Sequence, residues 1–263
     1  MKQSILDRLP SEHPWRDLLQ VHEKLDSTNT HARELARQGA AAGTVIIARA
    51  QSAGRGRLGR SFHSPADTGL YFSLILRPDC KPEQLMHLTC AAAVAACDAV
   101  ERACGLRPGI KWINDLTLEG KKLGGILTEL SFSTDGRVSS AVIGIGINVK
   151  KESFPRELQP IACSLADFAP QPELSALAAE LMLSLEEMSR SLLSDRAGLM
   201  DRYRKDCITT GKQVQLITPA SREEAESLRI DEEFRLVVRM ADGEERAVSA
   251  GEVSVRGMYG YTN

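Results

Sequence analysis

Residues 44–76 read TVIIARAQSAGRGRLGRSFHSPADTGLYFSLIL, two apolar runs separated by a polar loop rich in glycine and arginine. The first run, Thr44–Ala48, is β-branched and follows a glycine, which is typical of a buried strand. The second run, Gly69–Leu76, has the length and apolar content of another buried strand. The pattern predicts two strands joined by a loop over residues 51–67.

Helices and further strands are predicted on both sides of this unit. Asp26–Thr30 is rich in side chains that cap helices, so we expect a helix over His31–Gln38. An alanine-rich segment that begins with a proline predicts a long helix over Pro82–Cys104. Three more strands are expected at Ile110–Ile113, Gly124–Leu130 and Ser140–Val149. Because several strands follow one another around few helices, the order favours an α+β fold, a mixed sheet packed on helices, over an alternating doubly wound fold.

The pattern changes twice towards the C-terminus. Leu and Ala recur at three- and four-residue steps over Pro172–Cys207, which predicts helix. After Gly211 the apolar runs are short and alternate with polar residues, and Asp242-Gly243 is a strong hairpin signal. We therefore expect two domains, a larger one over residues 1–210 and a small all-β domain over residues 211–263.

Composition and charge narrow the class of protein. The chain has 263 residues, of which 43% are hydrophobic and 26% charged, and its formal net charge is −2. These values are those of an ordinary folded protein with no overall field that attracts nucleic acid or an anionic membrane. The longest nearly apolar stretch, Leu88–Cys97, is about half the ~20 residues that a membrane-spanning helix needs, and residues 1–12 lack the apolar core of a secretory signal. We expect a cytoplasmic protein.

The cysteines and histidines do not suggest a metal site. The six cysteines form no Cys-x-x-Cys pair, and we expect reduced thiols on buried faces. The five histidines show no metal-ligand spacing, and no Gly-x-Ser-x-Gly nucleophile motif is present. A zinc hydrolase and a serine esterase are therefore not supported.

The loop between the two opening strands carries a local excess of positive charge. No acidic residue occurs between Leu35 and Ala66, whereas this interval holds arginines 37, 49, 55, 57 and 60. In Gly54-Arg-Gly-Arg-Leu-Gly-Arg60 the glycines let the backbone approach a ligand, and guanidinium groups suit phosphate or carboxylate oxygens. The loop therefore predicts an anion-binding site.

The residues around these glycines exclude some kinds of anion-binding site. Gly54-x-Gly56-x-x-Gly59 matches the dinucleotide-binding pattern, but that pattern needs a helix after the loop, and Ser61–Pro65 starts none. A P-loop is excluded because Gly120-Lys121-Lys122 lacks the hydroxyl residue and the preceding spacing. Two alternatives remain, a flexible solvated Arg/Gly loop and an RNA-binding tract, although the interleaved aromatic residues typical of RNA binding are missing.

Two further polar clusters follow along the chain. Lys111-Trp-Ile-Asn-Asp115 and Lys121-Lys-Leu-Gly-Gly125 place Asn114, Asp115 and Lys122 at predicted strand ends, where they suit Mg²⁺, a nucleotide or a transferring anionic group. In isolation a solvated surface turn accounts for them equally well. Ile143-Gly-Ile-Gly-Ile-Asn148 has small residues that suit a strand beneath a flat ligand, and Asn148 offers a donor and an acceptor to a base edge.

Taken in order, these motifs resemble biotin protein ligases over roughly residues 21–150. The motifs that carry the resemblance are Ser27-Thr-Asn29, Gln51 with the Gly54–Arg60 loop, Lys111–Asp115, Lys122–Gly125 and Gly144–Asn148. The resemblance implies a catalytic domain similar to class II aminoacyl-tRNA synthetases and an SH3-like C-terminal domain. It also implies a two-step ligase that uses ATP, Mg²⁺ and biotin: biotin is activated to biotinyl-5′-AMP, and a lysine of the biotin carboxyl carrier protein of acetyl-CoA carboxylase then accepts it.

The resemblance also assigns roles to residues. Lys122, Arg57 and Arg55 are implied to be catalytic, with Lys122 contacting the biotin carboxyl and the α-phosphate. The implied biotin-binding residues are Ser27, Thr28, Asn29, Gln51, Arg55, Gly56, Arg57 and Lys122. The implied ATP- or adenylate-binding residues are Arg55, Arg57, Arg60, Phe62, Lys111, Asn114 and Asn148. Asp115 is the implied metal ligand.

Departures from the family pattern qualify these expectations. Phe62 stands where many relatives have Trp, and Ile113 where many have Pro, so we expect altered packing near the adenine rather than lost chemistry. Only about 20 residues precede the matching region, so we expect a stand-alone ligase without an N-terminal DNA-binding domain. We also expect a monomer or weak homodimer with no DNA or membrane partner. A lipoate protein ligase of the same fold is the alternative enzyme.

Overall fold

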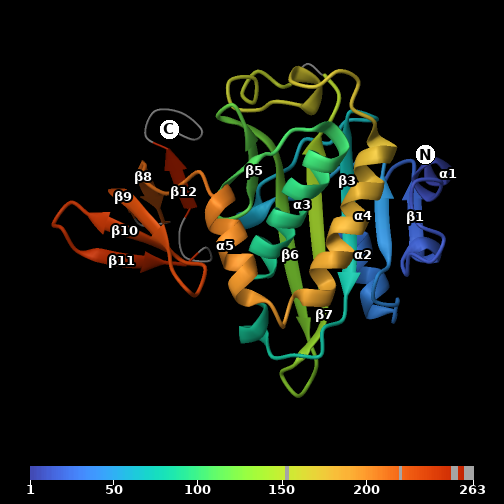
Figure 1. The fold of residues 1–263 in the computed structure, drawn as a ribbon, viewed down its shortest axis with the longest axis horizontal. Helices are drawn as coiled ribbons and strands as arrows, with labels where there is room; N and C mark the ends of the chain where they lie inside the picture. Colours follow the sequence, from blue (N-terminus) through green and yellow to red (C-terminus); the bar gives the residue numbers. More distant parts are fainter. Residues whose placement is uncertain (152–153, 219–220, 250–253, 258–263) are drawn as a thin grey trace.

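A computed structural model describes residues 1–151, 154–218, 221–249 and 254–257, and these form two β-sheets with helices packed around the larger one (Figure 1). The strand order in the larger sheet is β1-β2-β3-β7-β6-β5-β4. Only β1 and β2 pair in parallel, and the other neighbours are antiparallel, so the sheet is mixed as predicted. The strands are β1 (Leu19–His22), β2 (Val45–Ala48), β3 (Gly69–Leu76), β4 (Gly109–Lys111), β5 (Asp115–Leu118), β6 (Lys121–Phe132) and β7 (Val138–Asn148).

Helices cover both faces of this sheet. Side chains alternate between the faces of a strand. Ile46, Ile75 and Val142 pack with Ala32 and Ala36 of α2 (Thr28–Arg37), while the residues next to them in their strands belong to the main core. That main core holds α3 (Leu88–Cys104) and α4 (Leu174–Ser191), which pack against each other. Because both faces are covered, β2 and β3 are buried along their whole length.

Two predicted helices begin elsewhere than expected. The first helix starts at Thr28 rather than at His31, because the Ser27 side chain accepts a hydrogen bond from the Thr30 N–H and caps it. The helix expected from Pro82 starts only at Leu88. Pro82–Leu85 instead form a separate 3₁₀ turn, closed by the Gln84 side chain, which accepts from the Lys81 N–H.

Several elements were not predicted because their sequences are short or strongly charged. They are α1 (Lys2–Leu6), β1, β5, β9 (Arg222–Ile230) and β12 (Ser254–Gly257). The helical prediction over Pro172–Cys207 corresponds to two helices, α4 and α5 (Arg196–Asp206). Residues 192–195 separate them, and the Asp195 carboxylate accepts from the Gly198 N–H to cap α5.

The smaller sheet lies beside α5, at the left of Figure 1. Its antiparallel strands follow the order β11-β10-β9-β8-β12, and the remaining members are β8 (Gln213–Ile217), β10 (Leu236–Met240) and β11 (Glu245–Val248). Gly243 turns between β10 and β11 with a φ of 89°, which confirms the predicted hairpin. A small antiparallel sheet is consistent with an SH3-like domain. The boundary at residue 211 stays a prediction, and residues 219–220, 250–253 and 258–263 of that domain lie outside the described residues.

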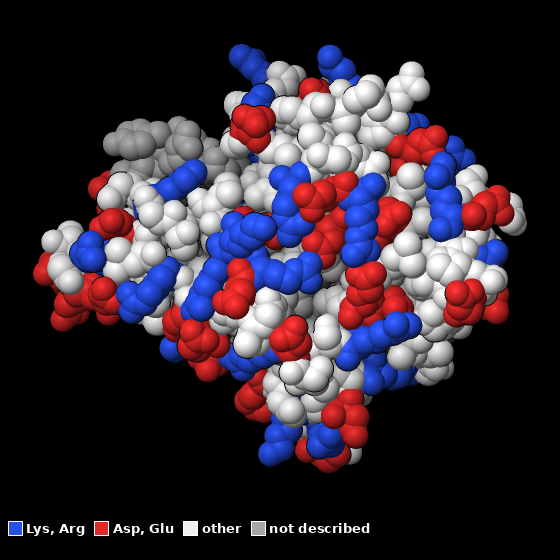
Figure 2. Space-filling view, viewed as in Figure 1, with Lys and Arg blue, Asp and Glu red and all other residues white. Residues whose placement is uncertain are grey.

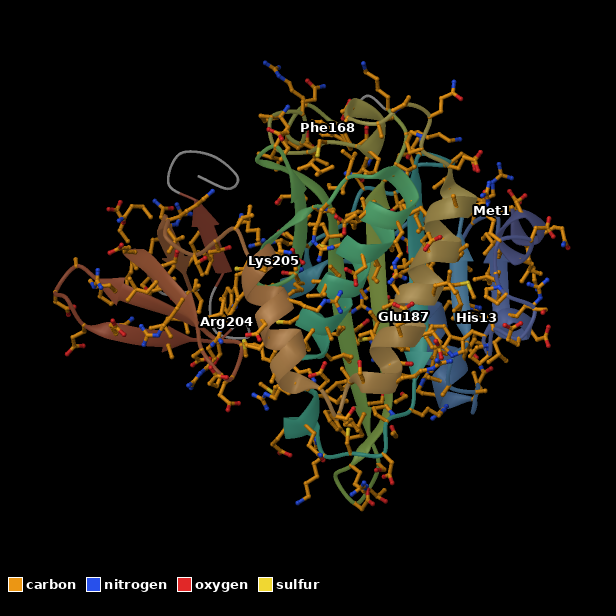
Figure 3. All side chains as sticks on the ribbon, in the orientation of Figure 1. Met1, His13, Phe168, Glu187, Arg204 and Lys205 are labelled. Atoms are coloured by element: carbon orange, nitrogen blue, oxygen red, sulfur yellow. The ribbon has the colours of Figure 1, made fainter. Side chains whose placement is uncertain are left out.

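Charged side chains of both signs are interspersed on the helix-covered face shown in Figure 2. Arg102 of α3 and Glu187 of α4 form an ion pair of 2.8 Å, and Figure 3 labels Glu187 on α4 and Arg204 on α5. Arg107 joins α3 to α5 through Asp98 and Asp206. No helix in the described part of the chain is long and apolar enough to cross a lipid bilayer.

All six cysteines are free thiols, as predicted, and five are buried. Burial raises the pKa of the Cys163 thiol to about 11, so that thiol is protonated at neutral pH.

Candidate active site

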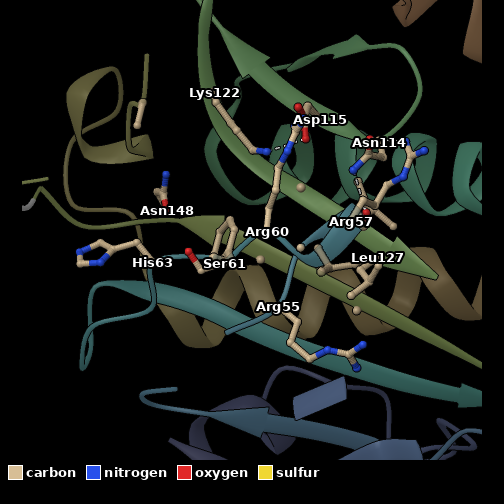
Figure 4. A pocket seen from close by; sticks show the side chains of 18 of the residues that line it. Arg55, Arg57, Arg60, Ser61, His63, Asn114, Asp115, Lys122, Leu127 and Asn148 are labelled. Atoms are coloured by element: carbon tan, nitrogen blue, oxygen red, sulfur yellow. Dashed lines mark hydrogen bonds and ion pairs between the residues drawn. The ribbon is translucent and has the colours of Figure 1, made fainter. Parts of the chain in front are cut away.

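A cavity of about 600 Å³ opens where the start of α2, the loop Gly54–Arg60 (the arginine loop) and the ends of β4 to β7 meet (Figure 4). Every site residue predicted from the sequence lines it. These residues are Ser27, Thr28, Asn29, Gln51, Arg55, Gly56, Arg57, Arg60, Phe62, Lys111, Asn114, Asp115, Lys122 and Asn148. Residues more than 100 positions apart therefore share one concave site, which is the usual form of a small-molecule site.

One end of the cavity is a network of uncharged hydrogen-bonding groups. Gln51 Oε1 accepts from the Thr28 N–H at 2.8 Å, and the buried Ser73 hydroxyl lies 2.9 Å from the Thr28 hydroxyl. Asn29 Oδ1 lies 2.7 Å from the same Ser73 hydroxyl, and its Nδ2 donates to Leu127 O. The network fixes these side chains in one arrangement, because each polar atom that moves would lose a buried partner.

The same network continues into the base of the arginine loop. Gln51 Nε2 donates to the Ser64 hydroxyl at 2.9 Å, and that hydroxyl donates to Phe62 O at 2.9 Å. Gly54 sits against this turn: a Cβ there would overlap Phe62 O and crowd the Ser64 hydroxyl. Gly54 is therefore required for the loop to fold back onto its own base.

The arginines of the loop point in different directions (Figure 4). Arg57 Nη1 donates to Asn114 Oδ1 at 3.0 Å, and Arg60 extends toward Asp115 and Lys122. Arg55 points away from them and forms an ion pair of 3.1 Å with Glu129. Burial lowers the pKa of Arg57, although an arginine that starts from so high a value stays charged at neutral pH. The loop thus delivers fixed positive charge into the cavity.

Lys122 and Asp115 form an ion pair of 2.6 Å at this charged end. Asp115 is the only acidic residue among the described residues that line the cavity. Mg²⁺ is bound by carboxylates together with substrate phosphates, and one carboxylate that already holds an ammonium group does not form a protein site for it. The described residues also contain no group of three or more His, Cys, Asp or Glu residues placed to hold a metal. The role of Asp115 as a metal ligand stays a prediction.

The two asparagines are tied to the backbone. Asn114 Nδ2 donates to Ile126 O at 2.9 Å, and Ile126 N–H donates to Asn114 O. Asn148 Nδ2 donates to Cys163 O at 2.9 Å. Their proximity to phosphate and adenine remains a prediction, but both side chains are held in place by these bonds.

Gly144 and Gly146 on β7 line the cavity and also make room for side chains of the protein itself. We expected their lack of side chains to suit a flat ligand. In the structure a Cβ at Gly144 would overlap the Asn29 side chain, and a Cβ at Gly146 would overlap the Phe62 ring. The small residues therefore make room for two of the protein's own side chains, and these in turn line the cavity.

Sequence reasoning missed four features of the site. Ser73 and Glu129 have a signal in the sequence, since Ser73 interrupts an apolar run and Glu129 is the one charged residue in the predicted strand Gly124–Leu130. Glu129 binds Asn29 and Arg55, so it belongs to the network. Ser64 and the apolar wall of Phe154, Leu158, Ile161 and Ala162 have no such signal. A parallel bridge between Lys122 and Ala162 brings this wall to the cavity. Only the tertiary fold determines that pairing.

The cavity therefore has two chemically different ends. The Thr28, Gln51 and Ser73 end offers neutral donors and acceptors, and the Arg57, Arg60 and Lys122 end concentrates positive charge. Such a site suits an elongated ligand with a polar, uncharged head at one end and an anionic group at the other. It also suits a reaction that brings two anionic groups together, because fixed cations stabilise the charge that accumulates.

Comparison with known proteins identifies the family. The Biotin/lipoate A/B protein ligase family matches residues 21–148. The chain is 42% identical to the "Bifunctional ligase/repressor BirA" of Bacillus subtilis over 176 residues, which cover 66% of this chain and 54% of that protein. It is 33% identical to the "Biotin--[acetyl-CoA-carboxylase] ligase" of Mycobacterium tuberculosis over 246 residues, which cover 91% of this chain and 89% of that protein.

A solved structure shares the fold. The biotin protein ligase of Aquifex aeolicus in complex with biotin and ATP superposes with a TM-score of 0.77 at 24% identity, and the match covers 91% of this chain and 98% of that one. Matches in sequence and in fold therefore extend well beyond the motifs of the site. The chain belongs to the biotin protein ligase family.

Proposed function

We propose that the chain is an ATP-dependent biotin protein ligase. The observation that carries the proposal is the single cavity in which a neutral hydrogen-bonding end faces a cluster of Arg57, Arg60 and Lys122. Biotin has the matching form, a neutral ureido ring at one end and a carboxylate at the other. The names of relatives support the substrates: the M. tuberculosis relative is named a biotin–[acetyl-CoA-carboxylase] ligase, and the A. aeolicus structure contains biotin and ATP.

The neutral end would bind the ureido ring. Ser27, Thr28 and Gln51 would exchange hydrogen bonds with its carbonyl and N–H groups, and Asn29 would hold this end in shape through Ser73 and Leu127 O. Because those supporting bonds exist without a ligand, little reorganisation is needed on binding. Preorganised donors lower the free-energy cost of binding and improve selectivity.

The charged end would promote the first reaction. A carboxylate oxygen of biotin attacks the α-phosphorus of ATP, the bond to the β-phosphate oxygen breaks, and pyrophosphate leaves. Both reactants are anionic, so Lys122 and the guanidinium groups of Arg57 and Arg60 would neutralise the charge as it concentrates at the α-phosphate. Fixed charges of this kind supply several kcal/mol of transition-state stabilisation, on the order of 10²–10³ in rate for one donor.

The second reaction transfers biotin to a protein. A neutral lysine amine of the acceptor attacks the acyl carbon of the anhydride, AMP leaves, and the amide nitrogen loses a proton. We propose the biotin carboxyl carrier protein of acetyl-CoA carboxylase as the acceptor, as the name of the M. tuberculosis relative suggests. Until the acceptor arrives, the loop over Gly54–Arg60 would exclude water from the anhydride.

Pyrophosphate exchange into ATP tests the activity with purified protein. We expect exchange that requires biotin and is absent with lipoate or with no acid. Exchange that requires lipoate would identify the alternative enzyme of the same fold. No exchange with either acid, together with retention on RNA, would favour the hypothesis of an RNA-binding Arg/Gly tract.

A further inference from the structure

The turn between β9 and β10 packs against the segment Lys111–Asp115 of the larger domain, where Trp112 Nε1 donates a hydrogen bond to Phe234 O. Phe234 at this turn is 1% exposed and has a left-handed φ of 58°, which a phenylalanine adopts only when its surroundings require it. The Asp231 carboxylate shapes the turn, since its Oδ1 accepts from the backbone N–H groups of Glu233 and Arg235 at 2.9 Å each. The turn is therefore a built feature and not a loose connection.

The Phe234 ring is enclosed by residues of the larger domain. It stacks on His87 with centroids 5.6 Å apart and meets Tyr203 edge to face at 5.9 Å. The Arg196 guanidinium lies 5.8 Å from the ring centroid. Aromatic and cation–π contacts of this kind stabilise beyond simple burial, so the ring anchors the turn against α3 and α5.

Helix α5 also holds the backbone of the turn. Arg204 Nη2 donates to Ile230 O at 2.8 Å, and Arg196 Nη2 donates to Glu232 O at 2.6 Å. In Figure 1 α5 lies between the smaller sheet and α3, which is the position that these bonds require.

Three buried hydrogen bonds link this assembly to the backbone and indole of the active-site segment. Trp112 Nε1 donates to Phe234 O at 3.0 Å, and the Trp112 backbone N–H donates to the Thr209 hydroxyl at 2.8 Å. The Tyr203 hydroxyl donates to Ile113 O at 3.3 Å. The next residue, Asn114, is the one that accepts the hydrogen bond from Arg57. A continuous set of contacts thus runs from the smaller sheet to the arginine loop.

We propose that Phe234 is a positioning residue for the ligase reaction. Phe234 holds Trp112 and Ile113 and thereby fixes the position of Asn114, which accepts the hydrogen bond from Arg57. That bond keeps the arginine loop closed over the nucleotide end of the cavity. Phe234 is not among the described residues that line the cavity, so it acts through its neighbours. The proposal rests on the proposed function for the identity of the ligand, whereas the mechanical link stands on the contacts above.

Two variants and a matched control test the link. Trp112→Phe removes the indole N–H but keeps an aromatic ring, and Phe234→Ala removes the anchoring ring. Phe234→Leu is the conservative variant, which restores most of the buried volume. Val238→Ala is the control, because Val238 is fully buried on β10 but does not belong to the turn. All are compared at a temperature where each variant is folded.

We expect Trp112→Phe and Phe234→Ala to release biotinyl-5′-AMP about tenfold faster and to raise the KM for ATP by a similar factor. Trp112→Phe loses the buried hydrogen bond to Phe234 O, whereas Phe234→Ala keeps that carbonyl but loses the ring that holds it in place. Biotin binding without ATP should stay within about threefold, because the Thr28–Gln51 end is separately held. Phe234→Leu should recover most of the loss. Val238→Ala should lower the melting temperature while leaving adenylate release unchanged.

Hydrogen exchange of the segment 110–116 gives a readout without turnover. Exchange there should quicken in Phe234→Ala and not in Val238→Ala. The proposal is wrong if Phe234→Ala changes neither the release of adenylate nor the hydrogen exchange of residues 110–116. It is also wrong if Val238→Ala, at an equal loss of stability, changes both as much as Phe234→Ala does. If the unaltered protein makes no adenylate, the proposed function fails, and hydrogen exchange still decides the mechanical link.

Discussion

At the level of single residues, two cations that line the cavity, Lys122 and Arg55, are each held in an ion pair. Asp115 holds the Lys122 ammonium at 2.6 Å, and Glu129 holds Arg55 at 3.1 Å. Such pairs keep cations in place within a partly buried site at a modest cost in desolvation. When an anionic ligand enters, Lys122 gains a second acceptor without leaving the first, because an ammonium group has three donors.

Lys122→Ala tests the role of this ammonium. We expect adenylate formation to slow by at least ~100-fold, equivalent to about 2.7 kcal/mol of transition-state stabilisation. Single-turnover formation of biotinyl-5′-AMP measures the effect. Lys121→Ala is the control, because Lys121 is adjacent, exposed and outside the cavity, and its rate should stay within about twofold. A near-normal rate for Lys122→Ala would remove this residue from the mechanism.

At the level of elements, the arginine loop is held at its base and in its middle. Its base is fixed by Gln51, Ser64 and Gly54, and its middle by the bond from Arg57 to Asn114. Between these points Leu58 is 66% exposed and has a left-handed φ of 54°, so the tip itself has little packing. A loop whose base is fixed and whose tip is sparsely packed can open and close at low cost in free energy.

Gly54→Val and Arg57→Ala should each speed the escape of bound biotinyl-5′-AMP. Valine at position 54 forces the loop away from Phe62 O, and alanine at position 57 removes the contact with Asn114. We expect about a tenfold increase in the dissociation rate for Arg57→Ala, measured by displacement of labelled adenylate. Ser52→Ala, an exposed position at the loop base, serves as the control. Unchanged escape in both loop variants would show that the loop is not a lid.

The loop also shows how far the sequence could predict the site. Its flanking strands follow from β-branched runs, and the interval rich in arginine predicts an anionic ligand. The partner of Arg55 does not, because Glu129 lies 74 residues away and meets it only across the folded sheet. For the same reason β5 and β9 were missed, since their short or charged sequences become strands only through pairing with neighbours.

At the level of the whole molecule, the two sheets are joined by buried aromatic and hydrogen-bonded contacts. His87 contributes to this joint: its ring stacks on Phe234, and Nε2 lies 2.8 Å from Leu192 O. Its Nδ1 is buried without a hydrogen-bond partner among the described residues. Burial therefore lowers the pKa of His87, and the folded protein keeps this ring neutral.

The neutral ring makes stability depend on pH. The unfolded chain takes up a proton at His87 near pH 6.5, whereas the folded chain does so only at lower pH. The unfolded state then binds more protons, so the contribution of His87 is complete above pH 6.5 and is lost as the pH falls towards the folded-state pKa. Chemical denaturation at pH 7.5 and 5.5 should show a smaller loss on acidification for His87→Phe than for the unaltered protein. An equal loss would show that the joint does not sense protonation. His13 and His22, whose pKa values burial also lowers, contribute to the residual pH dependence.

The general architecture was predictable, whereas the joint was not. Hydrophobic periodicity and turn residues specify a mixed sheet, its helices and the β10–β11 hairpin. The sequence does not indicate that Phe234 is buried, because a buried and an exposed phenylalanine in a charged turn look the same in sequence. Its burial depends on the docking of two separately predicted units.

A crystal structure of the chain after reaction with biotin and ATP would decide whether the cavity holds and shields an acyl-adenylate. We predict that the bicyclic ring lies against Thr28 and Gln51, that the phosphate lies beside Lys122, and that Arg57 folds over it. A nucleotide or biotin bound elsewhere, or Arg57 and Arg60 turned to solvent above an occupied cavity, would show that the arginine loop does not close over the ligand as proposed.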